Sequence, residues 1–155
     1  MPDYLVRGSV FENLMEECFQ LNRSLIEVAK QLTEDLGVTG AQWGVLGALG
    51  RDDAPRTIAE AARRMGLARQ SVQRVADALA DQGLVEYLPN SEDRRTKLAE
   101  VTGAGRALLA ELETRQLAWA NRTAGDLSRA NIEEAMRLIK QIRERTSIDP
   151  DDIDG

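Results

Sequence analysis

The N-terminal part of the chain shows a regular spacing of apolar residues that predicts one long helix. Apolar side chains recur at alternating intervals of three and four residues, namely Phe11, Leu14, Cys18, Leu21, Leu25, Val28 and Leu32. This heptad spacing places them along one seam, the arrangement by which one helix packs against another. Gly37 is a natural stop for this helix, because glycine readily adopts the left-handed conformation found at helix ends.

The middle of the chain contains two capping boxes, a sequence pattern that starts helices. Residues 39–42 open one helix, and residues 57–60 open another that is expected to end at Gly66. A further helix is predicted over residues 69–82, with Gly83 as its stop. Its apolar positions recur at helical spacing and are expected to face inward. They are Val72, Val75 and Leu79.

After Gly83 the pattern changes and predicts a β-hairpin. Residues 84–88 and 97–101 are typical of two short strands, and the polar segment 90–95 lies between them. Two more helices are then expected, each with a capping residue in front of it and an apolar face. Thr102 caps the first, which carries Leu108, Leu112 and Trp119, and Ser128 caps the second, which carries Ile132, Ala135, Met136, Ile139 and Ile142. The predicted fold is mainly α with a small β-hairpin.

The two helices on either side of Gly66 meet the requirements of a helix-turn-helix. Ala62 is small enough for the helices to cross closely, Gly66 allows the positive φ of the turn, and Val72 can pack inside. In such motifs the N-terminal part of the second helix enters the major groove of DNA. Arginine there can pair with guanine and glutamine with adenine. The residues left on that surface are Arg69, Gln70, Ser71, Gln73 and Arg74.

The tip of the predicted hairpin carries two arginines beside an aspartate. An arginine at such a tip can enter the minor groove or bind a phosphate, and Asp93 can hold the guanidinium of Arg94 or Arg95 by a hydrogen bond. Any two short helices joined by a glycine can mimic a helix-turn-helix, and an arginine-rich surface helix is usually only a solvated face. The hairpin that follows makes the combination specific. The predicted DNA contacts are Arg56, Arg69, Gln70, Ser71, Gln73, Arg74, Asp93, Arg94, Arg95 and Lys97.

The net charge of −6, from 20 basic and 26 acidic side chains, argues against DNA binding when it is taken for the whole chain. Its distribution changes this conclusion. Residues 51–106 carry 10 basic and 9 acidic groups, whereas the segments before and after them carry net charges of −4 and −3. This balance supports a modest, salt-sensitive contact with phosphates. It also leaves open a second interpretation, a winged-helix module that contacts another protein.

In these motifs the sequence resembles the MarR family of transcription regulators. The resemblance is carried by residues 36–43 (LGVTGAQW), 71–79 (SVQRVADAL), 82–85 (QGLV) and 93–102, from Asp-Arg-Arg to Val-Thr. It implies a winged helix-turn-helix protein that acts as a homodimer through its first, fifth and sixth helices. It also implies that Arg95 reaches the minor groove and that Asp93 orients it. One departure is Ala68, where family members often carry a capping Ser or Thr.

We therefore predict two regions. Residues 1–36 and 103–155 form a helical dimerisation region, and residues 37–102 form a winged helix-turn-helix lobe that binds DNA. The apolar faces of the terminal helices are too extensive for one small lobe to cover, and a symmetric dimer would bury them and present two recognition helices to a pseudo-palindromic operator. The predicted interface residues are Phe11, Leu14, Leu112, Trp119, Ile132, Met136 and Ile139.

Two weaker signals concern ligands and redox sensing. Trp43, with Leu46, is a candidate for lining a pocket for a small aromatic ligand, although a single Trp on an apolar helix face is more often a core residue. Cys18 lies on the first helix, as does the reactive cysteine of the peroxide-sensing OhrR branch of the family. Glu16 and Glu17 beside it disfavour a thiolate, and its seam position favours a buried apolar role. An OhrR-like redox regulator remains an alternative.

The remaining features exclude other classes of protein. The chain has no histidine and one cysteine, so histidine-based triads and metal sites and thiolate-rich metal sites are excluded. We expect no enzyme activity, no metal and no cofactor. The absence of an apolar run of about 18 residues argues against a membrane span, and the single cysteine favours the cytoplasm. The predicted function is a transcription regulator, a repressor on double-stranded DNA that a signal releases.

Overall fold

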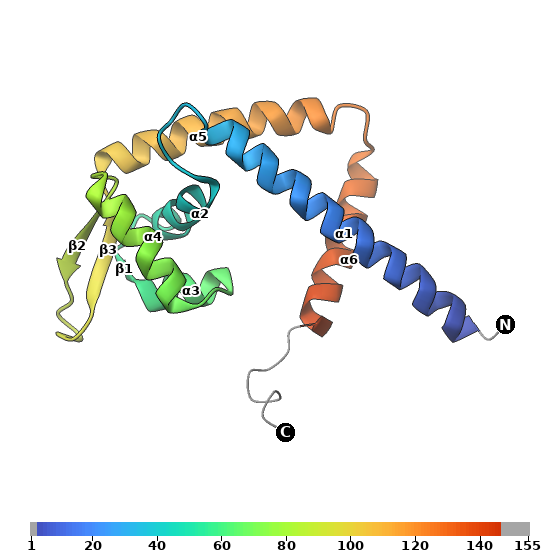
Figure 1. Cartoon of the computed structure of the whole chain (residues 1–155), viewed down its shortest axis with the longest axis horizontal. Coiled ribbons are helices and arrows are strands. Elements are labelled where there is room, and N and C mark those ends of the chain that lie inside the picture. The colour runs from blue at the N-terminus through green and yellow to red at the C-terminus, as the bar shows by residue number, and fades with distance from the viewer. Residues whose placement is uncertain (1–2, 147–155) are drawn as a thin grey trace, which may run out of the picture. The chain divides into compact units, whose positions relative to one another are not determined.

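The computed structural model describes residues 3–146, and the side chains from Val6 onward. Six helices and three strands occur in this part of the chain (Figure 1). In chain order they are α1 (Asp3–Thr33), α2 (Gly40–Gly50), β1 (Arg56–Thr57), α3 (Ile58–Met65), α4 (Arg69–Asp81), β2 (Val85–Pro89), β3 (Lys97–Val101), α5 (Gly103–Thr123) and α6 (Arg129–Thr146). The mainly helical fold with a small hairpin is confirmed.

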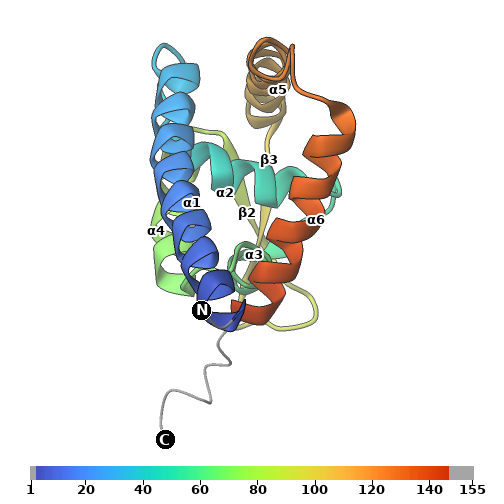
Figure 2. The same ribbon diagram turned by 90° about the vertical axis from the view of Figure 1, so that its right-hand side faces the viewer.

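Contacts divide the chain into two compact units, Met1–Gln116 and Leu117–Gly155. This boundary falls inside α5 and differs from the predicted boundaries, which follow expected function rather than compactness. The division into a dimerisation region and a DNA-binding lobe (residues 37–102, called the lobe from here on) therefore stays a prediction. In the first unit, α1 is one continuous helix and α2, α3 and α4 gather beside the sheet (Figure 2).

The predicted capping boxes start α2 and α3. Thr39 Oγ1 accepts a hydrogen bond from the Gln42 backbone at 3.1 Å, and the Gln42 side chain accepts one from the Thr39 backbone at 2.9 Å. The Thr57–Glu60 pair repeats this arrangement at the start of α3, at 3.2 Å and 2.9 Å. Each box satisfies two backbone N–H groups that would otherwise lack partners at the helix start.

The sheet has the strand order β1-β3-β2, and both pairings are antiparallel. β2 and β3 form the predicted hairpin, with Val85 opposite Val101. β2 begins and ends one residue later than expected and includes Pro89, which an edge strand tolerates because it pairs on one side only. β1 was not predicted. Its two residues pair with β3 and join the helix-turn-helix to the hairpin.

The core of the lobe lies between the helices and the sheet. Its largest fully buried side chains come from α2 and α4 and include Leu46, Leu49, Val72 and Leu79. β3 contributes Ala99 and Val101, and Tyr87 packs against the cluster from β2. Helices and hairpin therefore share one core, which fixes the position of α4 relative to the strands.

The first turn of α5 lies directly against the hairpin. Thr102 Oγ1 accepts a hydrogen bond from the Gly105 backbone at 3.1 Å, as expected of a capping residue, and donates one to the Gly83 carbonyl at 2.7 Å. Gly105 is buried so closely that a Cβ atom there would collide with the Leu84 carbonyl. Within residues 3–146, no helix is long and apolar enough to cross a membrane.

Candidate nucleic-acid interface

The turn between α3 and α4 has the geometry of a helix-turn-helix. Gly66 has a φ of +65°, a left-handed conformation that glycine adopts without strain. Its N–H and that of Leu67 bond back to carbonyl groups of α3, which ends that helix. Ala68 caps α4 without any side-chain hydrogen bond, as expected. The N-terminal half of α4 then presents four exposed side chains, those of Arg69, Gln70, Ser71 and Arg74.

The tip of the hairpin is ordered by its own hydrogen bonds. Asn90 Nδ2 donates to Thr96 Oγ1 at 3.0 Å, and the Arg95 backbone N–H donates to Asp93 Oδ1 at 3.0 Å. The Arg95 Nε lies 3.5 Å from the same carboxylate oxygen, while 94% of the Arg95 side chain is exposed. Of the two arginines, Asp93 therefore holds Arg95, and the guanidinium projects from a fixed base into solvent.

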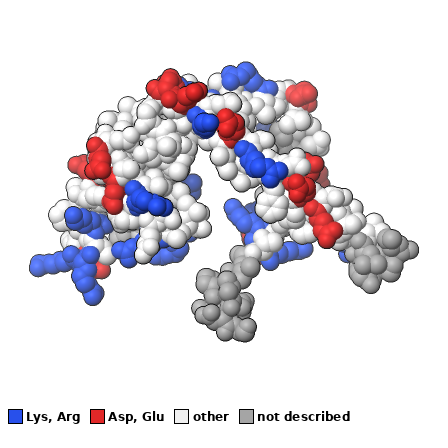
Figure 3. Space-filling model, viewed as in Figure 1, with Lys and Arg blue, Asp and Glu red and all other residues white. Residues whose placement is uncertain are grey.

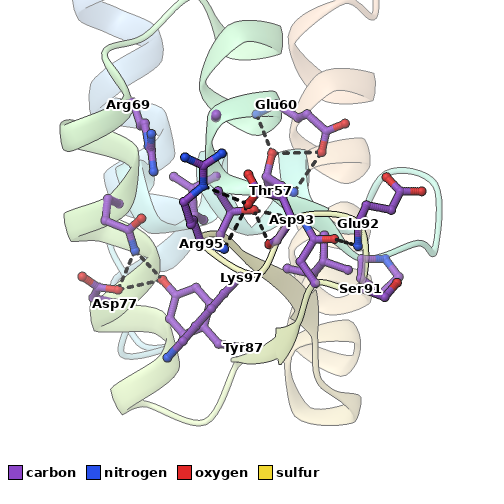
Figure 4. Close-up of a pocket in the computed structure, with 17 residues that line it drawn as sticks. Thr57, Glu60, Arg69, Asp77, Tyr87, Ser91, Glu92, Asp93, Arg95 and Lys97 are labelled. Carbon is purple, nitrogen blue, oxygen red and sulfur yellow. Dashed lines mark hydrogen bonds and ion pairs between the residues drawn. The ribbon is translucent and has the colours of Figure 1, made fainter.

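A groove of about 810 Å³ separates α4 from the hairpin. Its lining includes Arg69 and Gln73 from α4, the α3 capping box, and Asp93, Arg95 and Lys97 from the hairpin (Figure 4). Basic side chains gather around the hairpin tip at the lower left of Figure 3, whereas acidic and basic side chains alternate along α1. A recognition helix with an arginine-tipped hairpin beside it is a winged helix-turn-helix, and we call the β2–β3 hairpin the wing.

Gln73 is tied into a closed set of hydrogen bonds with Asp77 and Tyr87. Its Nε2 donates to Asp77 Oδ1 and to Tyr87 Oη, both at 2.9 Å. Tyr87 Oη in turn donates to Asp77 Oδ1 at 2.7 Å. The hydrogen bond from Tyr87, followed by that from Gln73, lowers the pKa of Asp77. Burial and the contact with Asp77 raise the pKa of Tyr87. The expected base-reading Gln73 is therefore less free than its neighbours on α4.

Arg56 is a correction to the predicted DNA contacts. Only 6% of this residue is exposed, and its Nη2 lies 2.8 Å from Asp52 Oδ2. Arg64 donates to the same Asp52 oxygen at 2.8 Å. The hydrogen bond from Arg56, and then that from Arg64, lowers the pKa of Asp52 from 3.8 to about 2. Arg56 thus ties the α2–β1 connection to the sheet and is too deeply buried to reach DNA.

The structure also corrects part of the predicted ligand site. Leu46 is fully buried in the core of the lobe and leaves no side-chain surface for a ligand. Trp43 is half-buried on α2, and Cys18 is half-buried on α1. Ligand binding at Trp43 and redox sensing at Cys18 stay predictions.

Six of the seven predicted dimer residues are exposed or half-buried in the single chain, and one is fully buried. Phe11, Met136 and Ile139 are 43%, 62% and 50% exposed, and Leu14, Trp119 and Ile132 are half-buried. Leu112 is a correction, because it is already fully buried in the single chain and a second copy has no surface of it left to cover. The other six residues remain available for contact.

Sequence reasoning missed Asp77 and Tyr87 as members of the site. The spacing of four residues between Gln73 and Asp77 was a local signal for a side-chain pair on one helix face. Tyr87 carried no such signal, because it reaches Asp77 from another element, ten residues further along the chain.

Comparison with known proteins agrees with this architecture. A model of the MarR family matches residues 36–96, from just before α2 to the wing tip. An uncharacterised protein of Mycobacterium tuberculosis is 32% identical over 129 residues, which cover 83% of this chain and 89% of that protein. The transcriptional activatory protein BadR of Rhodopseudomonas palustris is 27% identical over 129 residues, or 80% of this chain and 73% of BadR.

Solved structures share the fold. A MarR family transcription regulator matches with a TM-score of 0.82 at 17% identity, over 92% of this chain and 94% of that one. A mutant MarR from Escherichia coli, solved in complex with operator DNA, matches with a TM-score of 0.74 at 24% identity, over 84% of this chain and 93% of that one. The chain belongs to the MarR family. It is a DNA-binding transcription regulator, in a family of regulators rather than enzymes.

Proposed function

We propose that the protein acts as a homodimer that represses transcription by binding a pseudo-palindromic operator through α4 and the wing. The observation that carries this proposal is the placement of Arg95. Its guanidinium projects from a tip held by Asp93, across one groove from the exposed side chains at the start of α4. A recognition helix then occupies the major groove, and Arg95 reaches the neighbouring minor groove. The E. coli relative solved with operator DNA supports this assignment.

The apolar surface of the terminal helices supports the homodimer. Of the eighteen residues of α6, all of them described, none is buried, although Met136 and Ile139 are large and apolar. Phe11, Leu21 and Leu25 on α1 are likewise 43% or more exposed. Such a surface marks an interaction site. A second copy covers it with matching surfaces and sets two recognition helices at a fixed spacing.

A signal that changes the separation of the two lobes would release the DNA, because both recognition helices must fit their half-sites together. A small aromatic molecule near Trp43 is our candidate for this signal. Activation is the alternative direction of regulation, and it is favoured by the relative BadR, which is a transcriptional activatory protein.

The test is binding to the DNA just upstream of the protein's own gene, measured by fluorescence anisotropy over a range of salt concentrations. Charge-assisted hydrogen bonds contribute about 1.5–3 kcal/mol, so we expect Arg95→Ala to weaken binding at least about tenfold. The salt dependence should also become shallower by about one counterion for each lost contact. Arg129→Ala is the matched control, because Arg129 is 92% exposed and is also paired with a neighbouring carboxylate.

Equal binding by wild type and Arg95→Ala would contradict the wing assignment. A second candidate function, contact with another protein, is favoured by the net charge of −6. The absence of any salt-sensitive binding by the wild-type protein at low salt would support that candidate instead.

A further inference from the structure

The C-terminal end of α4 is hydrogen-bonded to two other parts of the chain. Gly83, which follows the helix in a left-handed conformation, accepts a hydrogen bond at its carbonyl from Thr102 Oγ1, at 2.7 Å, where α5 begins. Gln82 lies one residue earlier and reaches the turn that follows α1. Its Nε2 donates to the Gly37 carbonyl at 2.9 Å. The end of the proposed recognition helix therefore contacts both of the long helices that flank the lobe, or the turns next to them.

Two glutamine amides meet at this point, and the backbone groups around them allow one orientation only. Gln42 Oε1 accepts from the Thr39 backbone N–H in the capping box, so its Nε2 is left to donate to Gln82 Oε1, at 3.1 Å. Gln82 then turns its nitrogen to the Gly37 carbonyl, which can only accept. Gln42 thus holds Gln82 in the direction that reaches the turn.

The turn between α1 and α2 (residues 34–37) is fixed at both of its ends. Thr33, the last residue of α1, is buried, and its Oγ1 donates to the Ala29 carbonyl at 2.9 Å. Val38, directly after the turn, is buried as well. A Cβ atom on Gly40 would lie only 3.2 Å from the Ala29 Cβ, so the start of α2 packs closely against α1. The Gly37 carbonyl is therefore a fixed point of attachment and not part of a loose loop.

Arg115 of α5 binds the same turn. Its two Nη atoms donate to the two carboxylate oxygens of Asp35, at 2.5 and 3.0 Å, and Nη1 also donates to the Leu32 carbonyl at 3.2 Å. Such a two-pronged pair fixes direction as well as distance. Only 28% of the Arg115 side chain is exposed, so it is partly shielded from water. A continuous set of polar contacts thus connects α5, through the turn, with Gln82.

We propose that Gln82 is a positioning residue for DNA recognition, which fixes the lobe relative to α1 and α5 and thereby sets the half-site spacing that the dimer accepts. This inference rests on the proposed function, in which α1 and α5 belong to the dimerisation region and α4 enters the major groove. The apolar core already holds α4 inside the lobe. The bond from Gln82 adds a second attachment beside that of Thr102, so the lobe cannot turn about a single point.

Half-site spacing is the property that such an attachment controls. One base pair more or less moves a half-site by about 3.4 Å along the DNA and turns it by about 35°, so a rigid dimer binds one spacing best. A lobe that can turn accepts neighbouring spacings with less loss. One hydrogen bond changes an equilibrium by roughly two- to tenfold, and the proposed dimer contains this bond twice.

The experiment begins with selection of paired half-sites from random DNA by the purified full-length protein. Affinities are then measured for duplexes in which the selected spacing is kept or changed by one base pair. In Gln82→Ala the ratio between the affinities for the selected and the altered spacing should fall at least about fourfold, which is the effect of losing two bonds at the lower limit. Affinity for a duplex with a single half-site should stay at the wild-type value, because α4 itself is unchanged.

Gln42→Glu tests the same connection from its other end. A carboxylate there still accepts from the Thr39 backbone and keeps the capping box, but it cannot donate to Gln82. The spacing ratio should fall as in Gln82→Ala, and Gln42→Glu replaces that variant if it does not fold. Ala41→Glu is the matched control, because it adds the same charge at the neighbouring, exposed residue of α2. Gln31→Ala, which removes an exposed glutamine amide from α1, is the control for Gln82→Ala.

The possible outcomes separate this inference from the function on which it rests. A spacing ratio that Gln82→Ala leaves at the wild-type value overturns the inference, as does an equal fall of the ratio in Gln42→Glu and Ala41→Glu. A Gln82→Ala protein that loses as much affinity for one half-site as for two also overturns it, because α4 itself would then be damaged. In these cases binding to paired half-sites still stands. Selection of no paired half-sites by the wild type overturns the proposed function itself.

Discussion

The apolar side chains of the lobe are buried within the single chain, whereas those of the terminal helix α6 are exposed. In the lobe, twelve side chains from α2 to β3 form one buried cluster, and several of them have no exposed surface at all. In α6, none of the eighteen described residues is buried, and Met136, Leu138 and Ile139 are 46% or more exposed. The lobe is closed within one chain, whereas the apolar side of α6 is left open.

This difference separates two sources of stability. Burial of apolar area contributes about 25 cal/mol per Å², and the lobe obtains that contribution from its own residues. α6 obtains little of it within one chain, so its apolar side chains become useful only when something covers them. The lobe should therefore be stable independently of protein concentration, while the order of α6 should depend on the proposed second copy.

Leu79→Ala is the strongest test of whether the apolar core of the lobe is complete within one chain. Leu79 lies on α4 and is fully buried, and removing such a side chain leaves a cavity that costs about 2–5 kcal/mol. Chemical denaturation should show this loss in the free energy of unfolding. Leu67→Ala is the matched control, because Leu67 is 52% exposed in the turn before α4. Equal losses of unfolding free energy in both variants would contradict the description of Leu79 as a core residue of the lobe.

Met136→Glu tests whether a second copy covers the exposed apolar face of α6. A carboxylate in the middle of the exposed apolar face of α6 should prevent a second copy from covering it, because a buried unpaired charge is costly. Sedimentation analysis should show a dimer become a monomer. Operator affinity should fall by about 100-fold, since linked binding sites gain roughly that much or more over single ones.

Arg137→Gln is the control for Met136→Glu. It changes the net charge by the same single unit, but it lies on the polar side of α6 and should leave both the mass and the operator affinity unchanged. A Met136→Glu protein that remained dimeric would place the interface elsewhere on the chain.

The parts of the fold with local signals were predictable from the sequence. The long first helix, both capping boxes and the stop at Gly66 depend on residues within a few positions of each other, and the structure shows each of them. The wing strands were also found, because their apolar residues lie beside a polar tip. β1 was missed because two residues carry no periodicity, and its pairing partner lies more than 40 positions away.

The candidate site was predictable only in part, for the same reason. Arg95 and Asp93 are two positions apart, so their pairing could be expected from the sequence. Arg56 belongs to a basic run in the sequence, and its burial against Asp52 becomes visible only when the α2–β1 connection folds back. Tyr87 meets Asp77 only because β2 returns beside α4. Contacts between elements, rather than residue types, decided which polar groups are free to bind DNA.

The smallest expected effect is on the pH dependence of stability, and it comes from Asp52 at the surface of the lobe. Hydrogen bonds from Arg56 and Arg64 lower the pKa of Asp52 from 3.8 to about 2 in the folded protein. A lowered folded-state pKa means that the ionised carboxylate contributes stability above pH 3.8 and that this contribution is lost as the pH falls to about 2. Because the side chain is 52% exposed, water screens the interaction and limits its size.

Asp52→Asn should therefore make the free energy of unfolding depend less steeply on pH between 3.8 and about 2. The asparagine keeps an oxygen that can accept from Arg56, so the variant should still fold. Denaturation midpoints measured at several pH values in this range test the prediction. Asp81→Asn is the control, because no ion pair joins Asp81 to another described residue. If Asp52→Asn lost stability with falling pH as steeply as the wild type, the ion pairs of Asp52 would contribute nothing measurable to the stability of the lobe.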